Sequence, residues 1–192
     1  MKKGWGLSEG EQARILGGGA RFKLVRGGGR SGKSMGGSAE FLEHMAEDIK
    51  GSKGGELLYW LVAVDYERTR AEFGYIEGFL RKLGLKVEAT KRVDPGVIAV
   101  AGLLRIETKS GRDPRTLAMH APNGIIVCEA SQIDLETYQK CIGRLGEKRG
   151  WLHLSGTYET SLGWYPALAA AWAHGSKEER SFVLPSTSNR FI

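Results

Sequence analysis

The sequence predicts an α/β fold in which helices cover both faces of a mostly parallel sheet. The first observation is that strand-like and helix-like segments alternate along most of the 192 residues. The second is that "LLYWLVAV" at 57–64 and "GIIVC" at 124–128 are continuous apolar runs, which strands buried on both faces require. Strands that alternate with helices in this way are typical of three-layer folds with a parallel sheet.

In the first half of the chain, two predicted strands each precede a helix. The alternating segment "RFKLVRG" at 21–27 predicts a strand, and a helix is expected after the glycines, ending near "GSKGG" at 51–55. The strand at 57–64 is followed by a helix that starts near Tyr66 and stops by Gly84. The apolar faces comprise Phe41, Leu42, Met45 and Ile49 in the first helix and Ile76, Phe79, Leu80 and Leu83 in the second.

The second half continues the alternation. Short extended segments are expected at 85–90, 96–102 and 103–108, and a buried strand at 124–129. The later expected elements are a helix at 134–143, a strand at 151–156, a helix at 164–175 and a closing strand from 181 to a proline-marked exit.

The composition fits one folded domain with a sizeable core, since 41% of the residues are hydrophobic. The net charge of +6 fits a polyanionic partner such as nucleic acid, although many solvated surfaces are also mildly basic. The two cysteines form no CxxC motif, so neither a disulfide framework nor a zinc site is expected, and a reducing, cytosolic setting is the default. No signal peptide or membrane-spanning run is evident, and no membrane partner is expected.

A glycine-rich motif follows the first predicted strand. Residues 27–34 read "GGGRSGKS", which satisfies the pattern G-x-x-x-x-G-K-[ST]. Such glycines let backbone N–H groups curl around an anion, and the next helix presents its positive end. Lys33 would reach the β- and γ-phosphates and Ser34 would ligate Mg²⁺. A flexible linker is also glycine-rich, but the position between a strand and a helix favours a phosphate cradle. The nucleotide-binding candidates are Gly27, Gly28, Gly29, Arg30, Ser31, Gly32, Lys33 and Ser34.

An acid at the end of a buried strand is the second candidate. Glu129 follows "GIIVC", and ligands of parallel sheets bind outside the carboxyl ends of the strands. We assign it the general-base or water-orienting role, with a surface glutamate as the alternative. Cys128 stands where nucleotide hydrolases usually carry an aspartate, and a thiol is a poor partner for a hard cation. Either another acid completes the metal's surroundings or hydrolysis is weak, and Cys128 is interpreted as a small buried core residue.

A third motif ends the strand expected at 151–156. Ser155, Gly156 and Thr157 are small residues that can sense a γ-phosphate or its attacking water. Tight turns after strands favour the same residue types, so the motif by itself is weak evidence for a functional site. The evidence is stronger because the motif follows the other two in the chain.

Together these motifs resemble the ATPase domain of the large subunit of tailed-bacteriophage terminases. The resemblance spans nearly the whole chain from about residue 20. It implies a three-layer P-loop NTPase fold, with a lead-in at 1–20, the ATPase domain at 21–184 and the start of a linker at 185–192. It is carried by "VRGGGRSGKS", "YWLVAVDYERTR", "RIETKSGRDPRTL" followed by "GIIVCEASQ", "LSGTYETSLGWY" and "FVLPSTSN".

The resemblance implies a DNA-packaging motor that uses ATP and Mg²⁺. Such a motor works as a ring at the portal of a procapsid, in the cytoplasm of the infected bacterium. Its partners are double-stranded viral DNA, other copies of itself, the portal protein and the terminase small subunit. At matching positions Glu129 is the catalytic carboxylate, Arg30 is a γ-phosphate sensor, and Ser155, Gly156 and Thr157 form the coupling motif.

Two departures from the family pattern stand out. Cys128 replaces the metal-associated aspartate, which puts the metal coordination in doubt. The family normally continues into a metal-dependent nuclease domain, whereas this sequence ends at Ile192. We therefore expect either a piece of a longer protein or an ATPase-only form, with no DNA cleavage by this chain.

Several basic and polar residues are weaker candidates. Arg112 and Arg115 lie where the family often carries an arginine that completes a neighbour's active site, although a solvated loop or a DNA contact fits equally well. Gln12 and the segment "DYERTR" at 65–70 are candidates for the adenine pocket. A basic patch that could touch DNA, or simply be solvated, consists of Lys140, Arg144, Lys148 and Arg149.

Two other functions are compatible with a phosphate cradle. A small-molecule kinase would need an arginine-bearing lid, which is not evident in the sequence. A nucleotide-binding assembly module with little turnover is suggested by Cys128.

Overall fold

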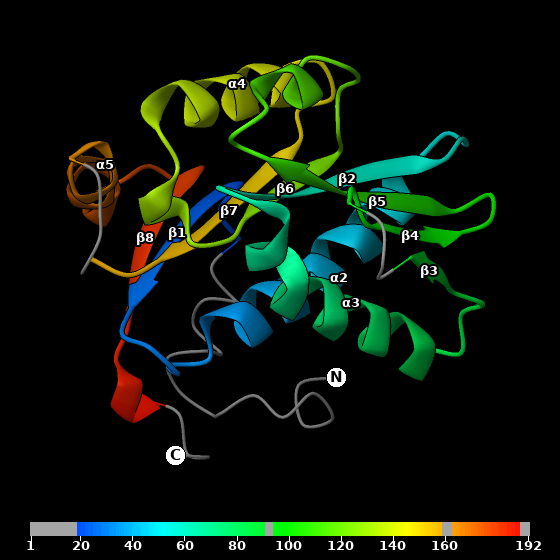
Figure 1. Cartoon of the computed structure of the whole chain (residues 1–192), viewed down its shortest axis with the longest axis horizontal. Helices are drawn as coiled ribbons and strands as arrows, with labels where there is room; N and C mark the ends of the chain where they lie inside the picture. The colour runs from blue at the N-terminus through cyan, green and yellow to red at the C-terminus, as the bar shows by residue number, and fades with distance from the viewer. Residues whose placement is uncertain (1–18, 91–93, 159–162, 189–192) are drawn as a thin grey trace.

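A computed structural model of the chain describes residues 19–90, 94–158 and 163–188. Within these residues one eight-stranded sheet forms the centre, in the order β3-β4-β5-β2-β6-β7-β1-β8 (Figure 1). In this order, neighbouring strands are parallel to each other from β5 across to β8. The β3-β4 and β4-β5 pairs at the other edge are antiparallel, so the sheet is mostly parallel, as predicted. The strands are β1 (Phe22–Gly27), β2 (Leu57–Ala63), β3 (Glu88–Thr90), β4 (Val97–Val100), β5 (Leu104–Ser110), β6 (Gly124–Val127), β7 (Trp151–Gly156) and β8 (Glu179–Leu184).

Helices pack on both faces of the sheet, which confirms the predicted three-layer arrangement. α2 and α3 lie on one face, and α4 and α5 pack on the other (Figure 1). No helix in the described part of the chain is long and apolar enough to cross a bilayer. The α-helices are α2 (Lys33–Gly51), α3 (Arg70–Lys82), α4 (Leu135–Leu145) and α5 (Trp164–Ala173). The 3-10 helices are η2 (Tyr66–Thr69), η3 (Pro114–Leu117), η4 (Ala130–Gln132) and η5 (Ser186–Ser188).

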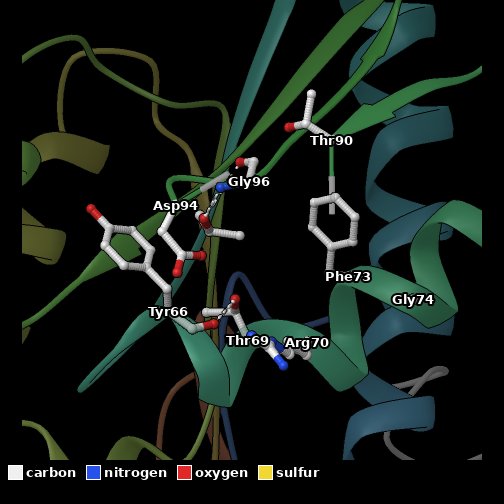
Figure 2. A pocket seen from close by; sticks show the side chains of 9 residues that line it. Tyr66, Thr69, Arg70, Phe73, Gly74, Thr90, Asp94 and Gly96 are labelled. Atoms are coloured by element: carbon white, nitrogen blue, oxygen red, sulfur yellow. Dashed lines mark hydrogen bonds between the residues drawn. The ribbon is translucent and has the colours of Figure 1, made fainter. Parts of the chain in front are cut away.

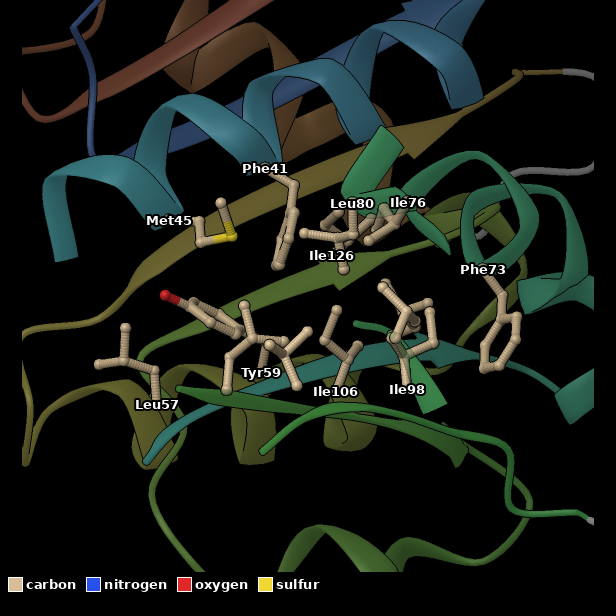
Figure 3. Packing of buried hydrophobic residues seen from close by; sticks show 14 of the residues in the cluster. Phe41, Met45, Leu57, Tyr59, Phe73, Ile76, Leu80, Ile98, Ile106 and Ile126 are labelled. Carbon is tan, nitrogen blue, oxygen red and sulfur yellow. The ribbon is translucent and has the colours of Figure 1, made fainter. Parts of the chain in front are cut away.

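Two apolar clusters fill the spaces between the layers. Phe41 of α2 and Ile76 of α3 belong to the cluster that contains Tyr59 of β2 (Figure 3). The next residue of the strand, Trp60, belongs to the opposite cluster with Cys141 of α4. Because successive side chains of a strand point to opposite faces, a strand between two helix layers needs apolar residues at every position. This requirement explains the continuous apolar run at 57–64.

The structure differs from the sequence-based expectation at two places. Residues 66–69 form η2, where the Asp65 side chain accepts a hydrogen bond from the Arg68 N–H, and the α-helix begins at Arg70 rather than near Tyr66. The short extended segments between 88 and 110 form an antiparallel meander, β3-β4-β5. Buried and half-buried residues alternate along β5, as they do in antiparallel strands that face solvent on one side.

The parallel strands bring the predicted motifs to one edge of the sheet. Gly27 at the end of β1 is in register with Leu184 of β8, and Arg26 is in register with Gly156 of β7. At the end of β6, Val127 is in register with Leu154 of β7. Because parallel strands end at the same edge, the segments that follow β1, β6 and β7 emerge side by side.

A buried cluster of ionisable side chains holds α2 against the sheet. The Lys23 ammonium of β1 lies 2.5 Å from the Glu40 carboxylate of α2, and Nδ1 of His153 in β7 lies 2.7 Å from the other carboxylate oxygen. His44 approaches the first oxygen at 3.3 Å. Burial by itself raises the pKa of the Glu40 carboxyl, but the two histidines and Lys23 outweigh it and hold this pKa well below its ordinary value.

Candidate functional site

The glycine-rich motif forms a loop between β1 and α2. A Cβ atom on Gly27 would collide with the backbone carbonyl of Leu184, so this position needs glycine for close approach, and one on Gly28 would displace the Ser186 hydroxyl. Gly32 has φ 89° and Arg30 has φ 59°, both in the left-handed region. The curled backbone predicted from the motif is therefore present.

The N-terminus of α2 is suited to an anion. Its N-cap residue is Gly32, which provides no side-chain cap, and the first turn contains no acidic residue. The first N–H groups of a helix lack intrahelical partners and carry positive potential, so they favour a negatively charged ligand. The Lys33 ammonium lies across the loop and donates to the carbonyl oxygens of Gly27 at 3.0 Å and Gly28 at 2.8 Å.

A cavity of about 470 Å³ opens beside this loop. It is lined by residues 29–35 of the loop and α2, by Ala71 and Tyr75 of α3, and by Glu129. The structure thus places Glu129 in the same cavity as Lys33 and Ser34, and this volume lies within the range of about 300–1,000 Å³ found for ligand sites.

Glu129 occupies a special backbone position between β6 and η4. Its φ of 48° and ψ of 50° lie in the left-handed region, which residues with a Cβ atom seldom adopt. The preceding Cys128 is buried in the core with α2 and α3, whereas Glu129 is half-buried and lines the cavity. The turn therefore sends the carboxylate toward the phosphate-binding loop while the thiol faces the helix layer.

A second carboxylate in this region was not identified from the sequence. Glu72 in the first turn of α3 is 3% exposed, next to Ala71, which lines the cavity. Burial raises the pKa of the Glu72 carboxyl, the nearby Ser34 and Cys128 side chains partly offset this effect, and the charge of Glu129 adds to it. Glu72 precedes Ile76 by one helical turn and lies on the same buried side of α3. The sequence could have indicated it as a charged residue on an otherwise apolar helical face.

Cys128 is held as a neutral thiol. Burial, followed by the Glu72 carboxylate and the charge of Glu129, raises its pKa well above the ordinary value. A protonated thiol is a weak ligand for hard cations. The position therefore contributes packing in the core rather than a metal bond.

The donors around Ser34 fit Mg²⁺. The Ser34 hydroxyl and the carboxylates of Glu72 and Glu129 are hard oxygen groups. Within the described residues, no group of three or more His, Cys, Asp or Glu side chains is arranged to hold a metal ion. Mg²⁺ usually retains several waters and binds through one or two protein oxygens together with substrate phosphates, so this donor set is compatible with it.

The Ser155–Thr157 motif lies at the end of β7, between β6 and β1. Ser155 is buried and its hydroxyl donates to the Val127 carbonyl at 3.4 Å, while a Cβ atom on Gly156 would lie 3.0 Å from the Ser131 amide nitrogen. Thr157 lines a separate cavity of about 330 Å³ together with residues 26–28. The motif thus contacts both the strand that precedes Glu129 and the phosphate-binding loop.

Comparison with solved structures gives consistent matches at low sequence identity. The ATPase domain of the Thermus phage P74-26 large terminase is 18% identical, with a TM-score of 0.70 over 91% of this chain and 80% of that chain. The large terminase of a thermophilic bacteriophage, in complex with ATP-γ-S, is 11% identical, with a TM-score of 0.69 over 97% of this chain. The N-terminal domain of the DNA packaging ATPase from bacteriophage phi29 is 11% identical, with a TM-score of 0.56 over 94% of this chain and 97% of that chain.

The chain has the fold of a terminase large-subunit ATPase domain. It spans 46% of the length of the large terminase that was solved with ATP-γ-S. No protein-family model matches the chain, and no curated protein matches it.

The two arginines proposed to act in a neighbour lie outside the cavity of this terminase ATPase fold. Arg112 follows β5, is largely exposed and approaches Asp65 at 3.8 Å. Arg115 is 92% exposed on the side chain, and its guanidinium donates to Asp113 at 2.9 Å. Both therefore lie exposed in the segment that follows β5, and their action in a neighbouring domain stays a prediction.

Of the adenine candidates, the segment at 65–70 lines a different pocket from the one beside the glycine-rich loop. Gln12 lies outside the described residues. Tyr66, Thr69 and Arg70 of the 65–70 segment line a different pocket of about 320 Å³, bounded on other sides by Phe73 and Asp94 (Figure 2). The assignment of this segment to the adenine pocket stays a prediction.

The candidate basic patch is divided between a helix and a loop. Lys140 of α4 pairs with Glu136 at 2.6 Å, and Arg144 is exposed in the last turn of that helix. Lys148 and Arg149 precede β7, so they lie near the edge of the sheet opposite the cavity that Glu129 and the glycine-rich loop line. They do not form one surface with the phosphate-binding loop.

Proposed function

We propose that this chain is the ATP-hydrolysing motor domain of a viral DNA-packaging terminase. The observation that carries the proposal is the cavity in which a phosphate-binding motif and a strand-end glutamate line the same space. The fold supports it, because the chain is similar to terminase ATPase domains and to the phi29 packaging ATPase domain. The similar large terminase from a thermophilic bacteriophage was solved with ADP and with ATP-γ-S.

The proposed division of labour follows the geometry. Lys33 and the first N–H groups of α2 bind the β- and γ-phosphates, and the Ser34 hydroxyl ligates Mg²⁺. When bound, Mg²⁺ supplies positive charge that offsets the charge developing on the phosphate oxygens. Glu129 orients a water molecule toward the γ-phosphate and accepts its proton, while Arg30 senses the γ-phosphate from within the loop.

Coupling to DNA movement is assigned to the end of β7. The Ser155 hydroxyl donates to the Val127 carbonyl, which directly precedes Cys128 and Glu129. A movement of Glu129 that follows loss of the γ-phosphate can therefore be transmitted through Ser155 to Thr157. In the proposed motor, double-stranded DNA is translocated by a ring of these domains at a portal protein, with the terminase small subunit as a further partner. The site of action is the cytoplasm of the infected bacterial host. Arg112 or Arg115 completes the neighbouring site in the ring.

Two substitutions test the nucleotide site. Lys33→Ala is expected to abolish measurable binding of a fluorescent ATP analogue, because the cradle loses its cation. Glu129→Gln is expected to retain binding but to slow single-turnover hydrolysis by a factor of about 10²–10⁴, since the water loses its base. Glu147→Gln, at an exposed position, is the matched control and should leave both quantities unchanged.

Three results would contradict the proposal. Unchanged nucleotide affinity in Lys33→Ala would exclude the cradle. Equal hydrolysis rates for the wild type and Glu129→Gln would instead favour an assembly module with little turnover. Transfer of the γ-phosphate to a small molecule rather than to water would favour a kinase. Hydrolysis that increases with double-stranded DNA supports the motor.

A further inference from the structure

The β1–β8 cavity is the space of about 330 Å³ that is lined by Arg26, Gly27, Gly28, Thr157, Tyr158 and Val183. It shares the phosphate-binding loop with the nucleotide cavity, which residues 29–35 line together with Glu129. At the boundary, the carbonyl oxygens of Gly27 and Gly28 accept hydrogen bonds from the Lys33 ammonium. The two cavities therefore adjoin along the loop, at the group assigned to the phosphates.

The strand order places the β1–β8 cavity at the far end of the loop from Glu129. Glu129 follows β6, which lies two strands from β1, whereas Val183 belongs to β8 on the opposite side of β1. In the proposed function the γ-phosphate lies next to Glu129 and the other phosphates follow the loop. The ribose and base are attached at the other end of the phosphate chain, so they leave the loop on the side away from Glu129. The β1–β8 cavity extends to that side.

A stacked pair of side chains forms one wall of this cavity. The Arg26 guanidinium lies over the Tyr158 ring, 5.1 Å from its centroid, and donates a hydrogen bond to the Tyr158 hydroxyl. The same ring makes an edge-to-face contact with Tyr165 of α5, with the ring centroids 6.1 Å apart. The Tyr158 ring is therefore held by β1 and α5 together. Nucleobases stack on aromatic rings and on guanidinium planes, because both present a flat face.

Two features of the cavity wall suit a ligand that has both an apolar face and hydrogen-bond acceptors. Tyr158 is 41% exposed and Val183 is 48% exposed, so apolar surface is open to water there. The Nε atom of Arg26 is buried and has no hydrogen-bond partner within residues 19–90, 94–158 and 163–188. A buried donor without an acceptor is costly. A nucleotide meets both requirements, since its base covers apolar surface while its ring nitrogens, ribose and α-phosphate accept hydrogen bonds.

We propose that the β1–β8 cavity is the subsite for the base of the bound nucleotide. The base stacks on the Arg26–Tyr158 pair, and Val183 packs against its edge. This proposal rests on the proposed nucleotide-binding function. It assigns the base to the β8 side of the loop rather than to the 65–70 segment, which lines another pocket.

The test compares a ligand that has a base with one that has none. ATP-γ-S and inorganic tripolyphosphate both carry three phosphates, and their binding to the whole chain is measured by isothermal titration calorimetry with Mg²⁺ present. Tyr158→Ala is expected to lower the ATP-γ-S affinity by about 5- to 150-fold, the range typical for loss of one stack between a base and an aromatic ring. Tripolyphosphate affinity should stay within about twofold of the wild type, because the phosphate cradle is intact.

Three further variants make the result specific. Tyr158→Phe keeps the ring and removes only the hydroxyl that accepts from Arg26, so ATP-γ-S affinity should stay within about threefold. Tyr66→Ala removes the aromatic residue of the 65–70 segment and should leave both affinities within about twofold. Tyr158→Leu keeps apolar bulk against Tyr165 but removes the flat face, so it carries the same expectation as Tyr158→Ala if the alanine variant folds poorly.

Unchanged ATP-γ-S affinity in folded Tyr158→Ala or Tyr158→Leu overturns the proposal. An equal loss of tripolyphosphate affinity also overturns it, because Tyr158 would then support the phosphate cradle rather than the base. A loss in Tyr66→Ala in place of Tyr158→Ala would assign the base to the other pocket. Failure of the wild type to bind tripolyphosphate or ATP-γ-S would reject the proposed function itself, which is a distinguishable result.

Discussion

Replacement of Glu40 by glutamine is expected to remove a large fraction of the stability of the domain. The substitution keeps the size of the side chain but removes the negative charge that lies 2.5 Å from the Lys23 ammonium, whose side chain is 3% exposed. At an effective dielectric constant of about 20, two unit charges at this separation attract by about 7 kcal/mol. Desolvation offsets part of this attraction, and breaking one side of a buried pair typically costs about 3–5 kcal/mol.

The expected loss is measurable by urea or thermal unfolding near pH 7. Native domains are stable by about 5–15 kcal/mol, so Glu40→Gln should lower the melting temperature by roughly 6–20 °C for a chain of this size. Glu43→Gln, at an exposed position of the same helix, should change stability by less than about 0.5 kcal/mol. Adding Lys23→Met to Glu40→Gln should recover stability, because the buried positive charge is then removed as well.

The pH dependence of this effect has a defined sign. The pKa of the Glu40 carboxyl is lowered in the folded state, so its contribution is complete above the ordinary carboxyl pKa of about 4.3. It is lost as the pH falls further toward the folded-state pKa, and the wild type should then approach Glu40→Gln in stability. A loss below about 1 kcal/mol at pH 7, or a difference between the two proteins that does not shrink in acid, would refute the reasoning.

Three further predictions concern helix α2 and the proposed ring. Gly36→Ala should stabilise the protein by about 0.5–1 kcal/mol, because its Cβ atom meets no other atom within 4 Å and alanine favours a helix. Gly37→Ala should destabilise it by about 1–3 kcal/mol in the same urea assay, because its Cβ atom would lie 2.8 Å from a buried imidazole nitrogen. If Arg112 or Arg115 acts in trans, mixing its alanine variant with Glu129→Ala should restore ATP hydrolysis that neither protein shows alone, and no restoration in any mixture would count against both arginines.

Local motifs made the phosphate-binding loop and the strand-end acid predictable. The spacing of Gly27, Gly32 and Lys33 sets backbone geometry and charge within a few residues, so the loop conformation follows from the sequence alone. Glu129 could be placed because it follows an apolar strand, and the ends of parallel strands meet at one edge. The roles of these residues remain predictions, whereas their common cavity is a feature of the structure.

The contacts of Glu72 were harder to predict. The sequence shows an acid on the buried side of a helix, but the side chains that affect its pKa are about 40 and 60 residues away on α2 and at the end of β6. The antiparallel pairing of β3, β4 and β5 was missed for a related reason. Short extended segments do not by themselves specify the direction of their neighbours, which depends on tertiary packing.

The sequence by itself determined the layered α/β fold, the phosphate-binding loop and the position of an acid after a buried strand. These features depend on periodicity and on spacings within single segments, which act over a few residues. The tertiary structure alone decided that Glu72 is buried and that Lys23 is the cation paired with Glu40. These pairings form only when α2, α3 and the sheet pack together, because burial and charge depend on neighbours that are distant in the chain.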